Sequence, residues 1–329
     1  MIILFGVFLL TLLVITALAI VRTDHLFVAV ILTGIFSLLI AANFFLLDAA
    51  DVALTEAAIG AGISSVLFFS ALSLAPEYER PSGSANRLLA LLVVAVITLI
   101  VVYATFDKPR FGDPMAPVHQ HVAPWYIEKT PVYIDIPNIV TAVLASFRGY
   151  DTLGEVFVVF TAGIGVLFLL GLPPRGGSGD GSDASDAGLG LRHYLIPRVV
   201  GRFLIPFIFL FGLYVQFHGE YGPGGGFQAG AIVAAAFILY ALLEGQEQAL
   251  RVLPSGVLLG LVSGGALLYG GVGAACMVLG SSFLDYSVLH ADPVTGQQLG
   301  ILLVEAGVGM TVVGVLLIIF HAFAGRKSR

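Results

Sequence analysis

Charge and cysteine are both scarce in this sequence. Only 11% of the 329 residues are charged and 58% are hydrophobic, with a mean hydropathy of +1.00. Soluble domains carry about 25% charged residues, so this composition excludes a water-soluble globular protein and indicates an integral membrane protein. The single cysteine, Cys276, excludes an intramolecular disulfide and a cysteine-held metal cluster within this chain. We also expect no cofactor and, without a basic patch, no nucleic-acid partner.

Long apolar runs divide the chain into candidate membrane spans. A helix needs about 20 apolar residues to cross the hydrocarbon, and spanning backbone must satisfy its own hydrogen bonds, which favours helices. We therefore predict an all-α polytopic membrane protein with about nine transmembrane helices. Their approximate ranges are 2–21, 26–47, 53–74, 88–106, 154–172, 203–217, 227–243, 254–280 and 299–322.

The distribution of Lys and Arg predicts how the chain is oriented. If the N-terminus lies outside, eleven of the fifteen basic residues fall in inside loops or in the C-terminal tail. The remaining four share one long loop, where the positive-inside bias is weak: Lys108, Arg110, Lys129 and Arg148. We expect a multi-pass protein of the cell inner (plasma) membrane, with the N-terminus outside and the C-terminus inside.

A polar segment interrupts the apolar pattern near the middle of the chain. Residues 176–190, GGSGDGSDASDAGLG, have the composition of a flexible linker. They separate residues 1–175, with five predicted spans, from residues 191–329, with four. This organisation predicts two helical bundles joined on the cytoplasmic side, which could have been separate polypeptides.

The loop at residues 107–137 is rich in proline and is expected to lack regular hydrogen bonding. His119 and His121 could bind a metal there, but two exposed histidines of a surface loop explain the pattern better, and we predict no metal site. Asn138 follows as a candidate N-cap. The short helix that it starts is expected to lie along the outer membrane interface.

Acidic residues within predicted spans are candidates for function, because a charge at the centre of the hydrocarbon costs about 2.5–3.5 kcal/mol. In DVALTEAAIGAG, Asp51 and Thr55 share one helical stripe and Glu56 lies one residue round from it. Asp51 is best explained as a helix cap, whereas Glu56 lies deeper and favours a proton or cation relay.

Two further motifs place acids near the ends of predicted spans. In SFRGYDTLGEVF, Arg148 precedes Asp151 and Glu155, and the three residues indicate equally an ion relay or an interfacial salt bridge. Glu305, in LLVEAGVGM, has no basic neighbour in sequence and faces either a cavity, a partner or the outer interface. His218 can titrate near neutral pH, although polar residues are also ordinary at the end of a span.

The segment HGEYGPGGGFQAG, residues 218–230, concentrates glycine between two apolar runs. Its loose match to a dinucleotide fingerprint carries no weight, because an apolar helix precedes it where that fingerprint needs a strand. The glycines either break a helix to form an ion site or shape a tight outer hairpin, which we favour. The hairpin residues are Pro223, Gly224, Gly225, Gly226 and Gly230.

These motifs resemble those of a known transporter family, the Mrp-type multisubunit cation/proton antiporters. The stretch from residue 203 to 242 is similar to the first hairpin of their MnhB-type subunit, through His218, Pro223, Gly224–Gly226, Phe227 and Gly230. It departs from that pattern by inserting residues 219–222 where the family has a short Asn-containing link. Glu305 looks like the acidic residue of the last helix of the MnhB-type subunit.

The first half resembles the C-terminal region of the large MnhA-type subunit of these antiporters, and equally the small subunits of membrane-bound hydrogenases. The similarity rests on DVALTEAAIGAG and FRGYDTLGEV, so the linker looks like a fusion joint between an MnhA-like tail and an MnhB-like subunit. The resemblance implies a non-enzymatic subunit of a secondary transporter that exchanges Na+ for H+ together with other antiporter subunits. Two alternatives are an ion-translocating subunit of an energy-converting oxidoreductase and a purely structural subunit.

Overall fold

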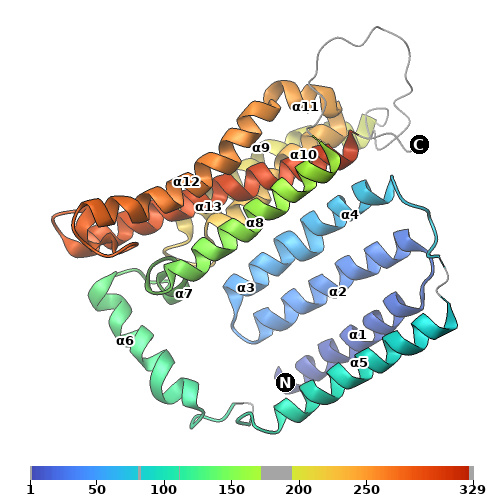
Figure 1. The fold of residues 1–329 in the computed structure, drawn as a ribbon, viewed down its shortest axis with the longest axis horizontal. Helices are drawn as coiled ribbons and strands as arrows, with labels where there is room; N and C mark the ends of the chain where they lie inside the picture. The colour runs from blue at the N-terminus through green and yellow to red at the C-terminus, as the bar shows by residue number, and fades with distance from the viewer. Residues whose placement is uncertain (1, 81–82, 111, 172–194, 326–329) are drawn as a thin grey trace.

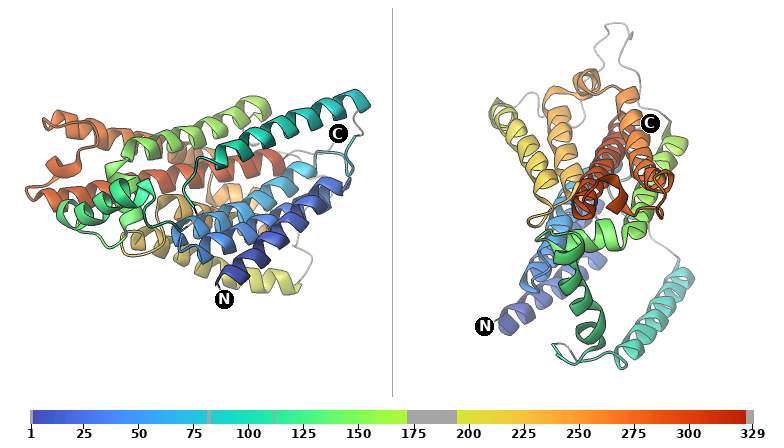
Figure 2. Two further views of the ribbon diagram at one scale, coloured as in Figure 1. Left: turned by 90° about the horizontal axis from the view of Figure 1, so that it is seen from below. Right: turned by 90° about the vertical axis from the view of Figure 1, so that its left-hand side faces the viewer.

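The computed structural model describes residues 2–80, 83–110, 112–171 and 195–325, and within these ranges the chain forms helices and no strand (Figures 1 and 2). Nine helical segments in the described part are long and apolar enough to cross a membrane. The predicted all-α, nine-span fold is thus confirmed. The linker at 176–190 lies outside the described residues, so its role as a joint stays a prediction.

The first half contributes five of these spans. The first two are α1 (Ile2–Arg22) and α2 (Leu26–Leu46). The third is continuous through α3 (Ala50–Thr55), a π-helical segment η1 (Glu56–Ile63) and α4 (Ser64–Leu72). The fourth and fifth are α5 (Ser84–Thr105) and α8 (Gly149–Leu170). Between them lie η2 (Val118–Val122), α6 (Ala123–Tyr133), α7 (Ile139–Ala142) and η3 (Val143–Phe147).

The second half contributes the other four spans. They are α9 (Leu195–His218), α10 (Gly226–Glu244), α12 (Ser255–Val278) and α13 (Pro293–Ala324). The short helix α11 (Gln246–Val252) follows α10, and the 3₁₀ turn η5 (Tyr286–Leu289) precedes α13.

Three helices begin earlier than the apolar runs predict. The fifth, sixth and ninth spans start at Gly149, Leu195 and Pro293 instead of near 154, 203 and 299. Helix α13 shows the reason, since the side chain of Asp292 accepts a 3.0 Å hydrogen bond from the backbone N–H of Thr295 and caps a polar first turn. Apolar runs mark only the part of a helix that lies in hydrocarbon.

Helix α13 is the centre of the packing. It contacts α12, α10 and α8, and Figure 1 shows α8 lying along it. Small residues bring these helices close together. A Cβ on Gly265 would lie 2.4 Å from the carbonyl oxygen of Gly307, and a Cβ on Gly163 would lie 3.0 Å from the side chain of Val315. Although α8 precedes the linker, it packs on the last helix of the second half.

The third span connects the remaining helices of the first half to this centre. Its η1 segment contacts both α2 and α10, and α2 in turn packs against α1. In contrast, every side chain described in α5 is exposed, and α5 stands apart from the other helices in Figure 2. The first half is therefore divided between an inner layer, α8 and α3–α4, and an outer layer.

Polar contacts gather the connecting segments of both halves at one end of the bundle. Asn138 Nδ2 donates to the carbonyl oxygen of Gly219 at 3.0 Å, and Gln298 Nε2 donates to that of Ile134 at 3.1 Å. Helix α11 lies at the opposite end from α6 and α7 (Figure 1). This alternation agrees with nine successive crossings. Which end faces the cytoplasm stays a prediction.

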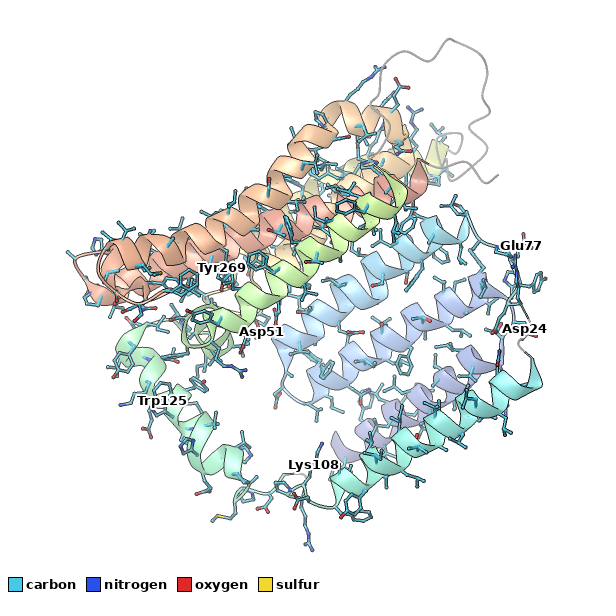
Figure 3. The ribbon with its side chains drawn as sticks, viewed as in Figure 1. Asp24, Asp51, Glu77, Lys108, Trp125 and Tyr269 are labelled. Carbon is cyan, nitrogen blue, oxygen red and sulfur yellow. The ribbon has the colours of Figure 1, made fainter. Side chains whose placement is uncertain are left out.

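Two tyrosines fix the start of α8 at this end. Tyr269 of α12 donates a 2.8 Å hydrogen bond to the carbonyl oxygen of Gly149, and Tyr286 donates one of 2.9 Å to that of Ala145. Both side chains are fully buried. Tyr269 lies at the same end of the bundle as Asp51 (Figure 3). The first turns of α8, which carry Asp151 and Glu155, are therefore held against the second half.

Candidate functional site

The Gly-rich segment forms a tight connection between α9, which ends at His218, and α10, which begins at Gly226. Gly225 has φ of +131°, a conformation that side-chain-bearing residues rarely adopt. A Cβ on Gly226 would lie 2.1 Å from the backbone carbonyl oxygen of Glu305. Glycine is required here because the backbone bends sharply while it lies directly against α13.

Asp51, at the start of the third span, holds this hairpin from the first half of the chain. Its Oδ1 atom accepts one hydrogen bond from the backbone N–H of Gly224 and one from Asn138 Nδ2, each 3.2 Å long. Asp51 also lies in the first turn of α3, where a carboxylate is favoured by the helix dipole. The residue thus combines the expected position at a helix start with a contact to the glycines that the sequence did not reveal.

One turn further along α3, Thr55 makes a second connection between the halves. Gln228 Nε2 of α10 donates a 2.8 Å hydrogen bond to the hydroxyl of Thr55. The same hydroxyl donates to the carbonyl oxygen of Asp51 at 2.9 Å. The predicted stripe of Asp51 and Thr55 therefore faces α10 and the hairpin.

A cavity of about 190 Å³ lies between this stripe, α8, the hairpin and α13. Its polar side chains come from both halves of the chain and include Asp51, Thr55, Thr152, Glu155, Gln228 and Glu305. No basic side chain of the described residues lines it. Three carboxylates that share a small cavity without a fixed positive charge attract cations and protons.

Glu305 occupies a special position because it also lines a second cavity. That cavity, of about 270 Å³, lies between α9 and α13 and is lined by Gln216, Glu220 and Gln298 among others. The negative charges of Glu220 and Asp51 act on Glu305 from the two sides. Partial burial raises the pKa of Glu220, which lies in the hairpin outside the spans. Glu305 is therefore the wall that the two cavities share.

The motif around α8 separates into two parts. Arg148 and Asp151 form an ion pair of 2.5 Å, and both side chains are more than half exposed. Glu155 instead lines the first cavity with Thr152, whose hydroxyl donates to the carbonyl oxygen of Leu144 at 2.8 Å. Of the three charged residues predicted here, Glu155 alone lines the cavity, and the other two pair at its edge.

Glu56 and His218 lie away from both cavities. Glu56 begins the π-helical segment, and its carboxylate folds over Gly60 and toward Ser37 of α2, since a Cβ on Gly60 would meet both side chains within 2.9 Å. His218 stacks between Tyr214 and Tyr221, with ring centroids 4.7 and 6.0 Å away. His119 and His121 lie in η2, and no described residues form a group of three metal ligands.

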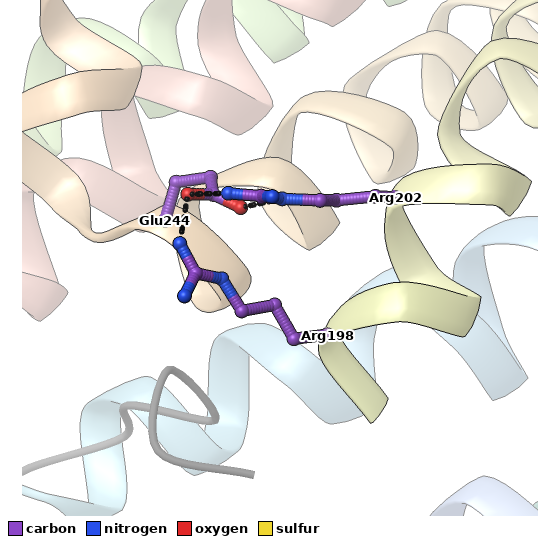
Figure 4. A network of polar contacts seen from close by, with 3 residues as sticks. All are labelled: Arg198, Arg202 and Glu244. Carbon is purple, nitrogen blue, oxygen red and sulfur yellow. Dashed lines mark hydrogen bonds and ion pairs between the residues drawn. The ribbon is translucent and has the colours of Figure 1, made fainter. Parts of the chain in front are cut away.

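Sequence reasoning missed several polar residues that the fold brings together. Gln228 and Gln216 gave no signal, because an isolated amide near the end of a span is ordinary. Glu244 is 5% exposed and lies between Arg198 and Arg202, with which it forms ion pairs at the opposite end of the bundle (Figure 4). The i,i+4 spacing of the two arginines, with an acid that closes α10, was a signal that could have predicted this clamp.

Comparison with known proteins places these features in a family. The model of a domain related to the MnhB subunit of the Na+/H+ antiporter matches residues 196–318. The models of the MBH subunits MbhD and MbhE match residues 11–77 and 88–172. Matches to three subunit types follow one another along the chain, and one of them covers most of the second half.

Individual relatives give the same order. A probable K+/H+ antiporter A/B subunit of Rhizobium meliloti is 26% identical over 93% of this chain. The putative antiporter subunit mnhB2 of Staphylococcus aureus (strain Newman) is 33% identical over 41% of this chain and 96% of its own length. The structure of the Mrp complex from Dietzia sp. DQ12-45-1b matches 98% of the chain, with a TM-score of 0.75 and 26% identity.

The chain spans about a third of the two larger proteins, 32% of the Rhizobium subunit and 35% of the Dietzia chain. It covers nearly all of the Staphylococcus subunit. The MbhD-like and MbhE-like domains precede the MnhB-like domain, as the sequence motifs predicted. The chain therefore belongs to the family of MnhB-related antiporter subunits, in the arrangement of an A/B-type fusion of the Mrp antiporters.

Proposed function

We propose that this chain is a membrane subunit of a multisubunit antiporter that exchanges Na+ for H+, and that it contributes to the cation path. The observation that carries the proposal is the cavity in which Asp51, Glu155 and Glu305 meet without a basic side chain. Carboxylates and hydroxyls are the ligands that hard cations prefer. The family membership supports the transporter class, and it favours a non-enzymatic subunit.

The partners that we propose are the other subunits of a hetero-oligomeric membrane complex. The exposed helix α5 and the large apolar surface of α1 agree with a protein that lies among lipids and other spans. A lone chain without a lysine in any span is expected to transport nothing. We also propose that residues 1–175 and 191–329 correspond to an MnhA-like tail and an MnhB-like subunit joined at 176–190.

A second function is considered because two family models carry the names of MBH subunits. Under this alternative, the same cavity couples ion movement to electron transfer in an energy-converting oxidoreductase such as a membrane-bound hydrogenase. This chain supplies no cluster of metal ligands among its described residues, so redox partners would have to supply them. The two functions therefore differ in the partners of the chain.

Co-purification decides between the two functions. A tag on the C-terminus allows the complex to be extracted in mild detergent, identified by mass spectrometry and reconstituted into vesicles. We expect several large antiporter-like membrane proteins, and proton efflux on addition of Na+. Efflux with K+ and not with Na+ would reassign the cation, which the Rhizobium relative makes a necessary control. Iron–sulfur or metal-centre subunits would establish the oxidoreductase.

A further inference from the structure

Asn138 connects three segments of the chain through one side chain. Its Oδ1 atom caps α7 by accepting from the backbone N–H of Val140 at 3.0 Å. Its Nδ2 atom donates to the carbonyl oxygens of Gly219 and Gly222, at 3.0 and 2.9 Å, and to Asp51. Asn138 thus reaches the start of α7, the α9–α10 hairpin and the start of α3.

The chemistry of an amide suits this position. Asparagine carries an acceptor and two N–H donors on one short side chain, so it can cap a helix and bind carbonyl oxygens together. Aspartate and serine are equally good helix caps. Ionised aspartate has no donor to offer, and the single short hydroxyl of serine cannot serve three acceptors. Helix capping alone therefore leaves the choice of asparagine unexplained.

The hairpin that Asn138 holds lies directly on Glu305. A Cβ on Gly219 would lie 3.3 Å from one carboxylate oxygen of Glu305, and a Cβ on Gly225 would lie 3.2 Å from the other. The hydroxyl of Thr141 adds a 2.7 Å hydrogen bond to the carbonyl oxygen of Gly219. Both anchors of the hairpin thus come from the segment that precedes α8, and the hairpin backbone is fixed against the shared wall of the two cavities.

We propose that Asn138 is a positioning residue, which fixes the α9–α10 hairpin against Glu305 by joining it to Asp51 and α7. In the inserted segment at residues 219–222, the hairpin has carbonyl oxygens that need a donor from outside. Asn138 supplies that donor from the first half of the chain. The position of the hairpin thereby depends on contact between the halves, and its effect on ion exchange rests on the function proposed above.

Amide hydrogen exchange of the assembled complex tests this role without reference to transport. In Asn138→Ser, helix α7 keeps its cap but the hairpin loses its donor. We expect the amides of residues 219–225 to exchange faster by about tenfold or more, while those of residues 139–142 stay protected. Asn138→Ala is the matched control, because it removes the cap as well and exposes both segments. Unchanged exchange of the hairpin in Asn138→Ser would overturn the proposal.

Transport measurements on the same variants separate this proposal from the proposed function. We expect Asn138→Ser to raise the cation KM by about tenfold with normal assembly, and Asn138→Asp to behave similarly although it is a good cap. If Glu305→Gln abolishes cation/proton exchange and Asn138→Ser leaves KM unchanged, the positioning role is wrong and the function stands. If Glu305→Gln has no effect while the hairpin of Asn138→Ser still loosens, the function is wrong and the anchoring stands.

Discussion

Gln228 of α10 donates a 2.8 Å hydrogen bond to the hydroxyl of Thr55, so a polar contact joins the two halves of the chain inside the membrane. The two residues are 173 positions apart. Together with the bond from Gly224 to Asp51, this contact closes one side of the first cavity. The cavity therefore exists only when the halves are packed together.

Replacing Thr55 by valine is expected to weaken that packing. Valine keeps the shape of threonine but leaves the amide of Gln228 without its partner, which costs about 1 kcal/mol or more when the amide is out of contact with water. We expect a lower thermal-unfolding midpoint for the purified complex. Thr55→Ser keeps the hydroxyl and serves as the control. Equal midpoints for the two variants would show that the contact contributes nothing to stability.

Neutralising Glu244 is expected to destabilise the opposite end of the bundle. Glu244 is nearly buried, whereas Arg198 and Arg202 are about one-third and one-half exposed, so water lessens the loss. We expect Glu244→Gln to reduce stability by about 1–3 kcal/mol, measured by thermal unfolding. Glu247→Gln is the control, because Glu247 forms an exposed pair with Arg251 on α11 and its loss costs at most about 0.5 kcal/mol. A matching effect of both variants would contradict the account.

Glu56 tests whether a relay extends beyond the cavity. Its carboxylate lies toward α2 in the π-helical segment, a kind of helix distortion that is frequent at functional sites. We expect Glu56→Gln to lower cation/proton exchange in vesicles while the complex assembles normally. Full exchange in this variant would exclude Glu56 from the path and would leave the cavity acids unaffected.

Glu220 gives a prediction for pH dependence. Because burial raises the pKa of Glu220, its negative charge is present only above that raised value and is lost as the pH falls through it. Glu220→Gln removes the charge at every pH. We therefore expect the variant to have a higher cation KM than the wild type at alkaline pH and the same KM at lower pH. A KM difference that persists with falling pH would exclude Glu220 as the source.

The sequence predicted the spans well because hydrocarbon thickness imposes about 20 apolar residues on each. Helix ends such as Pro293 were missed, since a capped polar turn carries no apolar signal. The acids of the cavity were also identifiable, because a charge in a span is costly. Their convergence was not, because it depends on which small residues meet, such as Gly163 against Val315. The π-helical segment that turns Glu56 toward α2 has no signature in hydrophobic periodicity.

The most direct test of the account is cation/proton exchange by the reconstituted complex that carries Glu305→Gln. Glu305 lines both cavities, so a neutral amide there interrupts the path without changing its shape. Assembly is checked by co-purification, and Glu247→Gln controls for the loss of one acid. We predict that exchange falls by about tenfold or more in Glu305→Gln and stays normal in Glu247→Gln. Normal exchange by a fully assembled Glu305→Gln complex would contradict the central claim.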